Sequence, residues 1–159
     1  MFKKHYIYQV VHIRTAKFKE LEVIADFQVR MAEETEGLRL NRENILRGVE
    51  AVFEDPGKGT YFVAIDHDEQ VLACLLITPE WSEWRNGTVY WFQSVYVMQD
   101  YRGTGIFRQM YEHVKAIVEE DEDLVGLRLY VEKDNVKAQQ VYEKLGMDGD
   151  HYKMYEWMK

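Results

Sequence analysis

The stretch from Thr88 to Gly105 constrains the fold more than any other, because a strand pattern changes there into a helix pattern through two glycines. Residues 88–97 are rich in Val, Tyr and Trp, which predicts a long strand. Helical spacing returns after the glycines, at Phe107, Met110, Tyr111, Val114, Ile117 and Val118. Gly103 and Gly105 therefore predict a tight turn that leaves backbone N–H groups uncovered at the positive end of a helix. Such a turn can hold a pyrophosphate, and it can equally be a plain connection without a ligand.

The other apolar patterns predict strands and helices on both sides of this junction. Strands are expected over residues 6–14, 61–65, 71–78, 127–131 and 152–158. Helices are expected over residues 18–32, 45–53 and 135–145. Asn135 is a good N-cap for the last of these helices, and Gly146 is suited to end it. The alternation predicts an α/β fold with a mixed sheet, and a length of 159 residues favours one domain over residues 1–159.

Charge and composition narrow the class of partner. The formal net charge of −8 disfavours nucleic acid, and the longest apolar run, Val71 to Ile77, is too short to span a membrane. Cys74 is the only cysteine, and its apolar neighbours predict a buried thiol. The N-terminal residues lack the apolar stretch of a signal peptide. We therefore expect a cytoplasmic protein that binds neither nucleic acid nor membranes.

Two phosphate-binding motifs other than the glycine turn can be excluded. Gly57-Lys58 is followed by Gly59, where a nucleotide-hydrolase loop needs Ser or Thr. Arg108 stands where a dinucleotide-binding turn needs its third glycine. The turn at Gly103 must therefore belong to another class of protein if it binds a ligand.

The glycine turn resembles the signature of the GNAT superfamily of acyl-CoA-dependent N-acetyltransferases. That signature places Arg or Gln before spaced small residues directly after a long strand, and here the segment reads Arg102-Gly103-Thr104-Gly105-Ile106-Phe107. Phe107 departs from the pattern, which usually has a small residue at that position. The C-terminal residues Asn135, Ala138, Tyr142 and Leu145-Gly146-Met147 resemble a second family motif. The order of elements from residue 6 to residue 158 is also similar.

The resemblance implies a fold, a co-substrate and a set of binding residues. The fold is a single-domain GNAT-like α/β fold, with a mixed, mostly antiparallel twisted sheet flanked by helices and a splayed central strand pair. Acetyl-CoA is the implied co-substrate, and no metal is expected. The implied pyrophosphate turn comprises Arg102, Gly103, Thr104, Gly105 and Ile106, with Phe107 beside it. The implied pantetheine contacts are Val95 and Val97, and the residues implied along the CoA arm are Asn135, Ala138 and Tyr142.

Amine acetylation needs a base for the ammonium group and an acid for the departing thiolate. The resemblance implies Tyr142 as the acid, although core packing is the alternative role for this side chain. Many family members supply a basic carboxylate on the fourth strand, but Gln93 and Ser94 stand there. Glu80 and Glu83 are the nearest acidic residues in sequence, and Glu83 is our candidate base. The alternative is that both carboxylates are simply solvated.

The acceptor is expected to be the primary amine of a small molecule, with a polyamine-like cation as one candidate. Carboxylates and aromatic rings could attract a cation, and the candidates are Glu33, Glu34 and Glu36 in a loop after the first helix, with Trp81, Trp84 and Tyr90. A solvated helix end and core or dimer packing are the alternative roles. Acetylation of protein N-termini or lysines, and a noncatalytic CoA-binding module, stay open as other functions. A homodimer also stays open.

Overall fold

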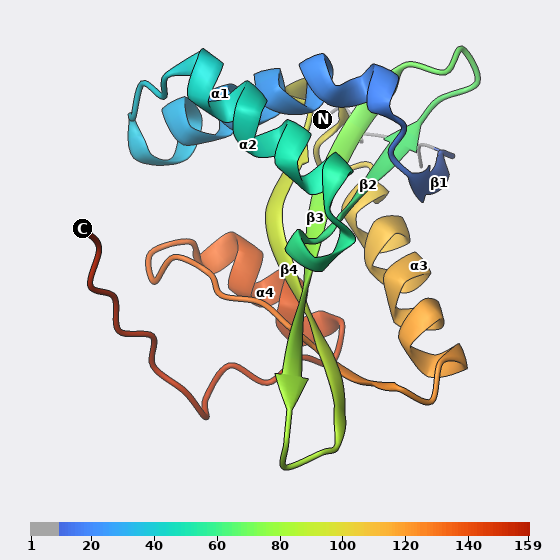
Figure 1. Cartoon of the computed structure of the whole chain (residues 1–159), viewed down its shortest axis with the longest axis vertical. Coiled ribbons are helices and arrows are strands. Elements are labelled where there is room, and N and C mark those ends of the chain that lie inside the picture. The colour runs from blue at the N-terminus through green and yellow to red at the C-terminus, as the bar shows by residue number, and fades with distance from the viewer. Residues whose placement is uncertain (1–9) are drawn as a thin grey trace, which may run out of the picture. The chain divides into compact units, whose positions relative to one another are not determined.

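A computed structural model describes residues 10–159 of the chain (Figure 1). The chain divides into two compact units, Met1–Arg128 and Leu129–Lys159. Residues 6–9 of the first predicted strand lie outside the described residues. None of the helices in the described part of the chain is long and apolar enough to cross a membrane.

The first unit is built on a five-stranded mixed sheet. The strands are β1 (His12–Thr15), β2 (Thr60–Ile65), β3 (Val71–Ser82), β4 (Gly87–Val97) and β5 (Leu124–Arg128), and they lie in that order across the sheet. The pairs from β1 to β4 are antiparallel, and β4 pairs with β5 in parallel. This arrangement confirms the predicted α/β fold with a mixed, mostly antiparallel sheet.

Three helices cover the sheet of the first unit, and a fourth belongs to the second unit. They are α1 (Leu21–Glu36), α2 (Arg42–Glu54), α3 (Ile106–Glu120) and α4 (Val136–Lys144). Short 3-10 turns occupy Phe18–Glu20, Pro56–Lys58 and Gln99–Tyr101. Asn41 caps α2, since its side chain accepts a hydrogen bond of 2.9 Å from the N–H group of Asn44. The helices predicted from apolar spacing are therefore confirmed, with the first beginning as a 3-10 turn at Phe18.

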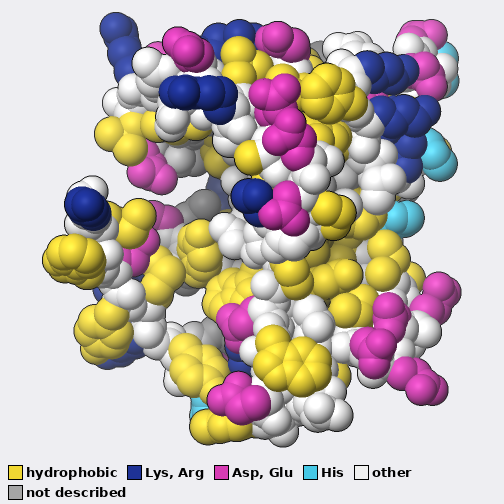
Figure 2. Space-filling model, in the orientation of Figure 1, with side chains coloured by type: hydrophobic (Ala, Val, Ile, Leu, Met, Phe, Trp, Pro, Cys, Tyr) yellow, Lys and Arg dark blue, Asp and Glu magenta, His cyan; other side chains and the backbone are white. Residues whose placement is uncertain are grey.

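The two faces of the sheet have separate apolar cores. Alternate residues of β2 point to opposite faces, so that Tyr61 and Val63 join the cluster with α1 and α2 while Phe62 contacts His113 of α3. The side chains buried against α1 and α2 include Ile24, Phe27, Val49, Cys74 and Tyr96. Where α1 meets α2, charged side chains alternate in sign over the surface (Figure 2), and Arg42 donates a hydrogen bond of 3.0 Å to Asp26.

Four predicted strands need correction. Within the described residues, the strand expected over residues 6–14 begins at His12 and ends at Thr15, and the strand expected over residues 71–78 continues to Ser82. The strand expected over residues 127–131 begins earlier, at Leu124, and ends at Arg128, because its parallel pairing runs from Thr88 opposite Leu124 to Trp91 opposite Arg128. Residues 152–158 form no strand, although their sequence alternates. A strand needs a hydrogen-bonded neighbour, and no described strand pairs with this segment.

The second unit contains α4 and the caps that its sequence predicts. Asn135 caps this helix, because its side-chain oxygen accepts a hydrogen bond of 3.1 Å from the N–H group of Ala138. Gly146 follows the helix with a φ angle of +85°, a left-handed conformation that favours glycine. Both predicted helix boundaries are therefore confirmed.

Candidate active site

Strands β4 and β5 part halfway along β4. Their last pair joins Trp91 to Arg128, whereas β4 continues to Val97. Residues 92–97 of β4 therefore extend beyond the pairing with β5. Among the described residues, no strand pairs with them on that side. This is the splayed central pair that the family resemblance implies.

A β-bulge lies in the half of β4 that pairs with β3 but not with β5. Leu76 of β3 is opposite Gln93 and Cys74 is opposite Tyr96, so Ser94 and Val95 together oppose the single residue Leu75. Ser94 has a φ angle of +49°, which is uncommon for a residue other than glycine. A bulge of this kind bends the strand and turns a main-chain group out of the ladder, and bulges often lie beside active sites. The bulge could not be predicted from sequence, since Ser94 carries no local signal for a left-handed backbone.

The glycine turn has the backbone conformation that its sequence predicts. Gly103 and Gly105 have φ angles of +77° and +86°, and Gly105 directly precedes α3. An added Cβ at Gly103 would meet no atom within 4 Å, so the backbone angle rather than crowding requires glycine there. No side chain caps the N-terminus of α3. The helix therefore presents its first-turn N–H groups and its positive dipole end, which together can bind an anion.

The side chain of Arg102 ties this turn to two other elements. Its Nε atom donates a hydrogen bond of 2.8 Å to the carbonyl oxygen of Val97, and its Nη2 atom donates to the carboxylate of Glu34. The guanidinium also lies over the Tyr96 ring, 5.3 Å from the ring centroid. A pantetheine contact through the Val97 carbonyl would therefore share that oxygen with Arg102.

Glu34 lies in α1 and not in a loop. The helix continues through Glu36 and ends at Gly37, which has a φ angle of +65°. The predicted loop position of Glu33, Glu34 and Glu36 is therefore wrong, because the left-handed glycine sets the helix end three residues after Glu34. The hydrogen bond from Arg102 lowers the pKa of Glu34, so the carboxylate is ionised at neutral pH.

A second polar cluster lies where β4 and β5 part. The two oxygens of Glu80 accept hydrogen bonds of 2.6 Å each, one from the indole N–H of Trp91 and one from the guanidinium of Arg128. The amide of Gln93 donates a bond of 2.7 Å to the hydroxyl of Thr78. Glu80 could be named from sequence, but its partners Trp91 and Arg128 could not, because the contact joins three strands.

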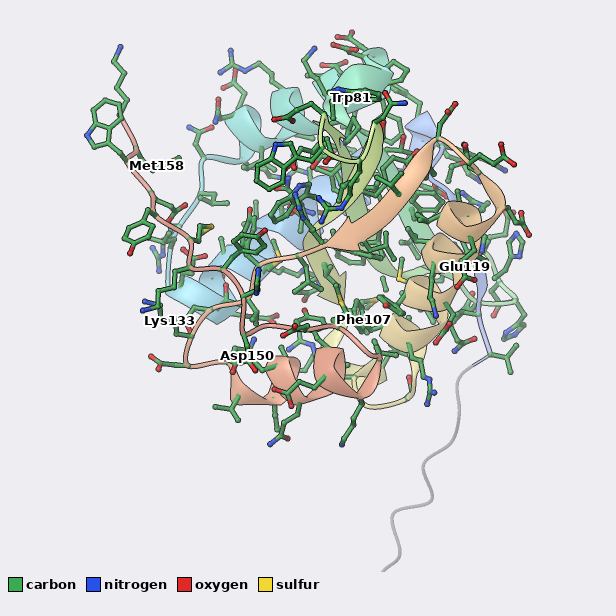
Figure 3. The ribbon with its side chains drawn as sticks, turned by 90° about the horizontal axis from the view of Figure 1, so that it is seen from below. Trp81, Phe107, Glu119, Lys133, Asp150 and Met158 are labelled. Atoms are coloured by element: carbon green, nitrogen blue, oxygen red, sulfur yellow. The ribbon has the colours of Figure 1, made fainter. Side chains whose placement is uncertain are left out.

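The predicted acceptor residues form two separate groups in the structure. Trp81 lies opposite Thr88, two residues before Tyr90, so Trp81 and Tyr90 lie on the same face of the sheet. Trp81 lies near the end of β3, and Trp84 and Glu83 lie in the turn that joins β3 to β4. Trp81 lies opposite Thr88 at the beginning of β4, whereas Phe107 lies in the first turn of α3, which follows the end of β4. The two labelled side chains lie apart in Figure 3. Tyr90 lines a cavity of about 250 Å³ beside Ile117 of α3. The acidic residues Glu33, Glu34 and Glu36 lie instead at the C-terminal end of α1.

Two further predicted residues have local surroundings that bear on their roles. Phe107 is half-buried, with its ring centroid 6.4 Å from that of Tyr111. Tyr142 belongs to α4 of the second unit, and burial raises the pKa of its hydroxyl. A raised pKa keeps this hydroxyl protonated at neutral pH, as a proton donor must be. The predicted contacts of Tyr142, Asn135 and Ala138 with CoA stay predictions.

Comparison with known proteins shows the family to which this chain belongs. The model of the acetyltransferase (GNAT) family matches residues 18–147, and the chain belongs to this family. Its members are N-acetyltransferases. The comparison with curated proteins gives no match.

Solved structures agree with this class. A possible acetyltransferase from Clostridium difficile 630 is 42% identical over 95% of this chain and 99% of its own, with a TM-score of 0.87. A probable acetyltransferase is 23% identical over 93% of this chain and 97% of its own, with a TM-score of 0.82. A protein described as a predicted acetyltransferase with acetyl-CoA, from Clostridium acetobutylicum, is 19% identical over 92% of this chain and 96% of its own, with a TM-score of 0.72.

Proposed function

We propose that this protein transfers the acetyl group of acetyl-CoA to the primary amine of a small molecule. The observation that carries the proposal is the uncapped N-terminus of α3 behind two left-handed glycines, directly after the splayed half of β4. A turn of this kind suits a pyrophosphate, which CoA carries. The relative in fold that is described with acetyl-CoA supports the same co-substrate.

Residues 102–106 would hold the pyrophosphate through backbone N–H groups. The pantetheine arm would then follow β4 past Val97 and Val95, where the bulge turns a main-chain group out of the ladder. The thioester would stop near the last β4–β5 pair, Trp91 and Arg128. Hydrogen bonds from the protein would hold the acetyl carbon in position for attack by the amine. Holding two reactants close together and correctly oriented raises the rate of a two-substrate reaction.

The attacking amine must first lose a proton. An alkyl ammonium with a pKa near 10.4 costs about 4–5 kcal/mol to deprotonate at pH 7. Glu80 is a weak candidate base, since both of its oxygens already accept hydrogen bonds, from Trp91 and Arg128. Glu83 lies in the β3–β4 turn, at the opposite end of β4 from the glycine turn. We therefore propose that the proton leaves through water, with Glu83 as the side chain to test as a base.

The departing thiolate needs a proton donor, and we propose Tyr142. The hydroxyl pKa is raised by burial, so transfer to a thiolate of pKa near 8.5 is uphill and needs a direct hydrogen bond in a dry site. The tetrahedral intermediate would collapse by breaking the C–S bond, with the electron pair going to sulfur and the proton following from Tyr142. A solvent proton is the alternative source.

The acceptor is proposed to be a cationic amine, and a polyamine-like molecule is one candidate. The net charge of −8 favours attraction of a cation over an anion. Protein N-termini and lysines are the second candidate acceptors. The missing strand carboxylate keeps a noncatalytic CoA-binding module as the third alternative.

One experiment separates these functions. Isothermal titration with acetyl-CoA measures cofactor binding, and thiol release is then followed with polyamines, other small amines and peptides. Turnover with small amines and not with peptides supports the proposal. Binding without turnover across the panel favours the noncatalytic module, and absence of acetyl-CoA binding overturns the proposed function.

A further inference from the structure

The contacts of Glu34 point away from the acceptor and toward the cofactor turn. One carboxylate oxygen accepts from Nη2 of Arg102, and the other accepts a hydrogen bond of 3.0 Å from the hydroxyl of Tyr96. Tyr96 is 4% exposed, so its hydroxyl is fixed by the core, and its ring lies under the same guanidinium. The carboxylate therefore joins the end of α1 to β4 and to the residue that opens the glycine turn.

Arg102 is held at both its side chain and its main chain. Its N–H group donates a hydrogen bond of 3.3 Å to the carbonyl of Gln99, and its Nε atom bonds the carbonyl of Val97. The next residues include two glycines, which have the greatest backbone freedom of any residue type. Fixing one end of such a turn reduces the conformational entropy that a ligand must remove when it binds.

We propose that Glu34 is a positioning residue that holds Arg102 and so keeps the glycine turn ready for the pyrophosphate of CoA. The inference rests on the proposed function, and it replaces the acceptor role predicted for this residue. Glu34 acts through Arg102 and does not touch the cofactor. Its removal should weaken acetyl-CoA binding and leave the KM for the amine unchanged.

A competing electrostatic effect has the opposite sign. Removing the negative charge of Glu34 leaves the Arg102 cation unpaired, which would attract a pyrophosphate. Both groups are partly exposed, with side chains 35% and 45% accessible, so salt screens this attraction. The hydrogen bond between Glu34 and Arg102 is a direct contact, so the loss of order in the turn depends less on salt than this attraction does. Measuring affinity at low and high ionic strength therefore separates the two effects.

The test uses Glu34→Gln in the full chain, with acetyl-CoA titrated calorimetrically in the absence of any amine. Loss of a charge-assisted hydrogen bond at a partly exposed site predicts a rise of about fivefold to tenfold in Kd, retained at 0.5 M salt. Glu36→Gln is the matched control, because it removes the same charge from the same helix end, and its Kd should match wild type. Tyr96→Phe removes only the hydroxyl partner of Glu34 and should raise Kd by a smaller factor.

Steady-state kinetics give a second readout, since the KM for acetyl-CoA should rise while the KM for the amine stays constant. Wild-type affinity in folded Glu34→Gln, tighter binding, or an equal loss in Glu36→Gln would each overturn the inference. If Glu34→Gln does not fold, unchanged acetyl-CoA affinity in Tyr96→Phe would overturn it instead. Failure of the wild-type protein to bind acetyl-CoA would contradict the proposed function, whereas the outcomes above test only the role of Glu34.

Discussion

A side chain at Gly105 should disrupt the glycine turn without unfolding the protein. Gly105 has a φ angle of +86° where the chain enters α3. A residue with a Cβ pays about 1–2 kcal/mol to adopt this left-handed conformation, and a β-branched residue pays more. In Gly105→Val the turn can keep its shape, in which case the protein loses that amount of stability. Alternatively, the turn relaxes to a negative φ, which moves the N–H groups that would bind pyrophosphate.

Relaxation should raise the Kd for acetyl-CoA by at least about tenfold, which corresponds to about 1.4 kcal/mol of lost binding energy. Calorimetric titration gives the Kd, and the melting temperature of the same preparation shows whether the fold survives. Gly37→Ala is the control, because Gly37 has a φ of +65° with no atom within 4 Å of an added Cβ. It should lower the melting temperature and leave Kd within about twofold, the equivalent of about 0.4 kcal/mol. Wild-type affinity in folded Gly105→Val would refute the pyrophosphate assignment.

Three further changes test the acid, the core and a buried ion pair. Tyr142→Phe should lower kcat by about 10²–10⁴-fold with little change in acetyl-CoA affinity, whereas a packing role predicts a near wild-type kcat and about 1 kcal/mol of lost stability. Burial raises the pKa of Cys74 to about 12, so iodoacetamide at pH 8 should label this thiol only after the protein unfolds. Labelling is measured by mass spectrometry, and rapid labelling of the folded protein would contradict the burial of the thiol. Glu20 is 4% exposed. Glu20→Ala should lower the free energy of unfolding, measured in urea, by about 3 kcal/mol, because Arg14 loses its bidentate partner.

The same ion pair predicts how stability depends on pH. Burial raises the pKa of Glu20, but hydrogen bonds from Arg14 and from the N–H group of Lys17 outweigh it, and the net pKa is lowered. A carboxyl group whose pKa is lower in the folded state stabilises the fold at pH values above its unfolded pKa, which is near 4.3. This contribution is lost as the pH falls through the folded pKa. The free energy of unfolding should therefore fall in acid, and more gently in Glu20→Gln than in wild type.

Features that depend on neighbours in sequence could be predicted. The glycine turn, the cap at Asn135 and the left-handed Gly146 each reflect the conformational preference of one residue next to a helix. The buried thiol of Cys74 follows from the apolar residues on both sides of it. The conformational preferences of single residues and the spacing of apolar residues were enough to predict the fold class. The family resemblance implied the splayed pair of strands.

Features that depend on distant residues could not be predicted. Glu34 and Arg102 are 68 residues apart, and nothing in the acidic run distinguishes Glu34 from Glu33 or Glu36. The bulge at Ser94 depends on how β3 and β4 pair, and the absence of a strand over residues 152–158 depends on which strand edge is available. Tyr90 was grouped with Glu34, although Tyr90 lies on the α3 side of the sheet and Glu34 lies at the C-terminal end of α1.

The cluster around Glu80 bears on how the reaction can be organised. Its carboxylate bonds Trp91 of β4 and Arg128 of β5, and these two residues form the last pair before the strands part. The Arg128 guanidinium lies 5.8 Å from the centroid of the Trp91 ring, so a charged bond and a ring contact act on the same pair. These contacts form a clamp on the last β4–β5 pair, and the gap between the two strands begins beyond that pair. In the proposed binding mode, the thioester would stop near it. A carboxylate with both oxygens committed to that clamp is a poor proton acceptor, which is why we assign Glu80 to the architecture of the gap and leave deprotonation of the amine to water.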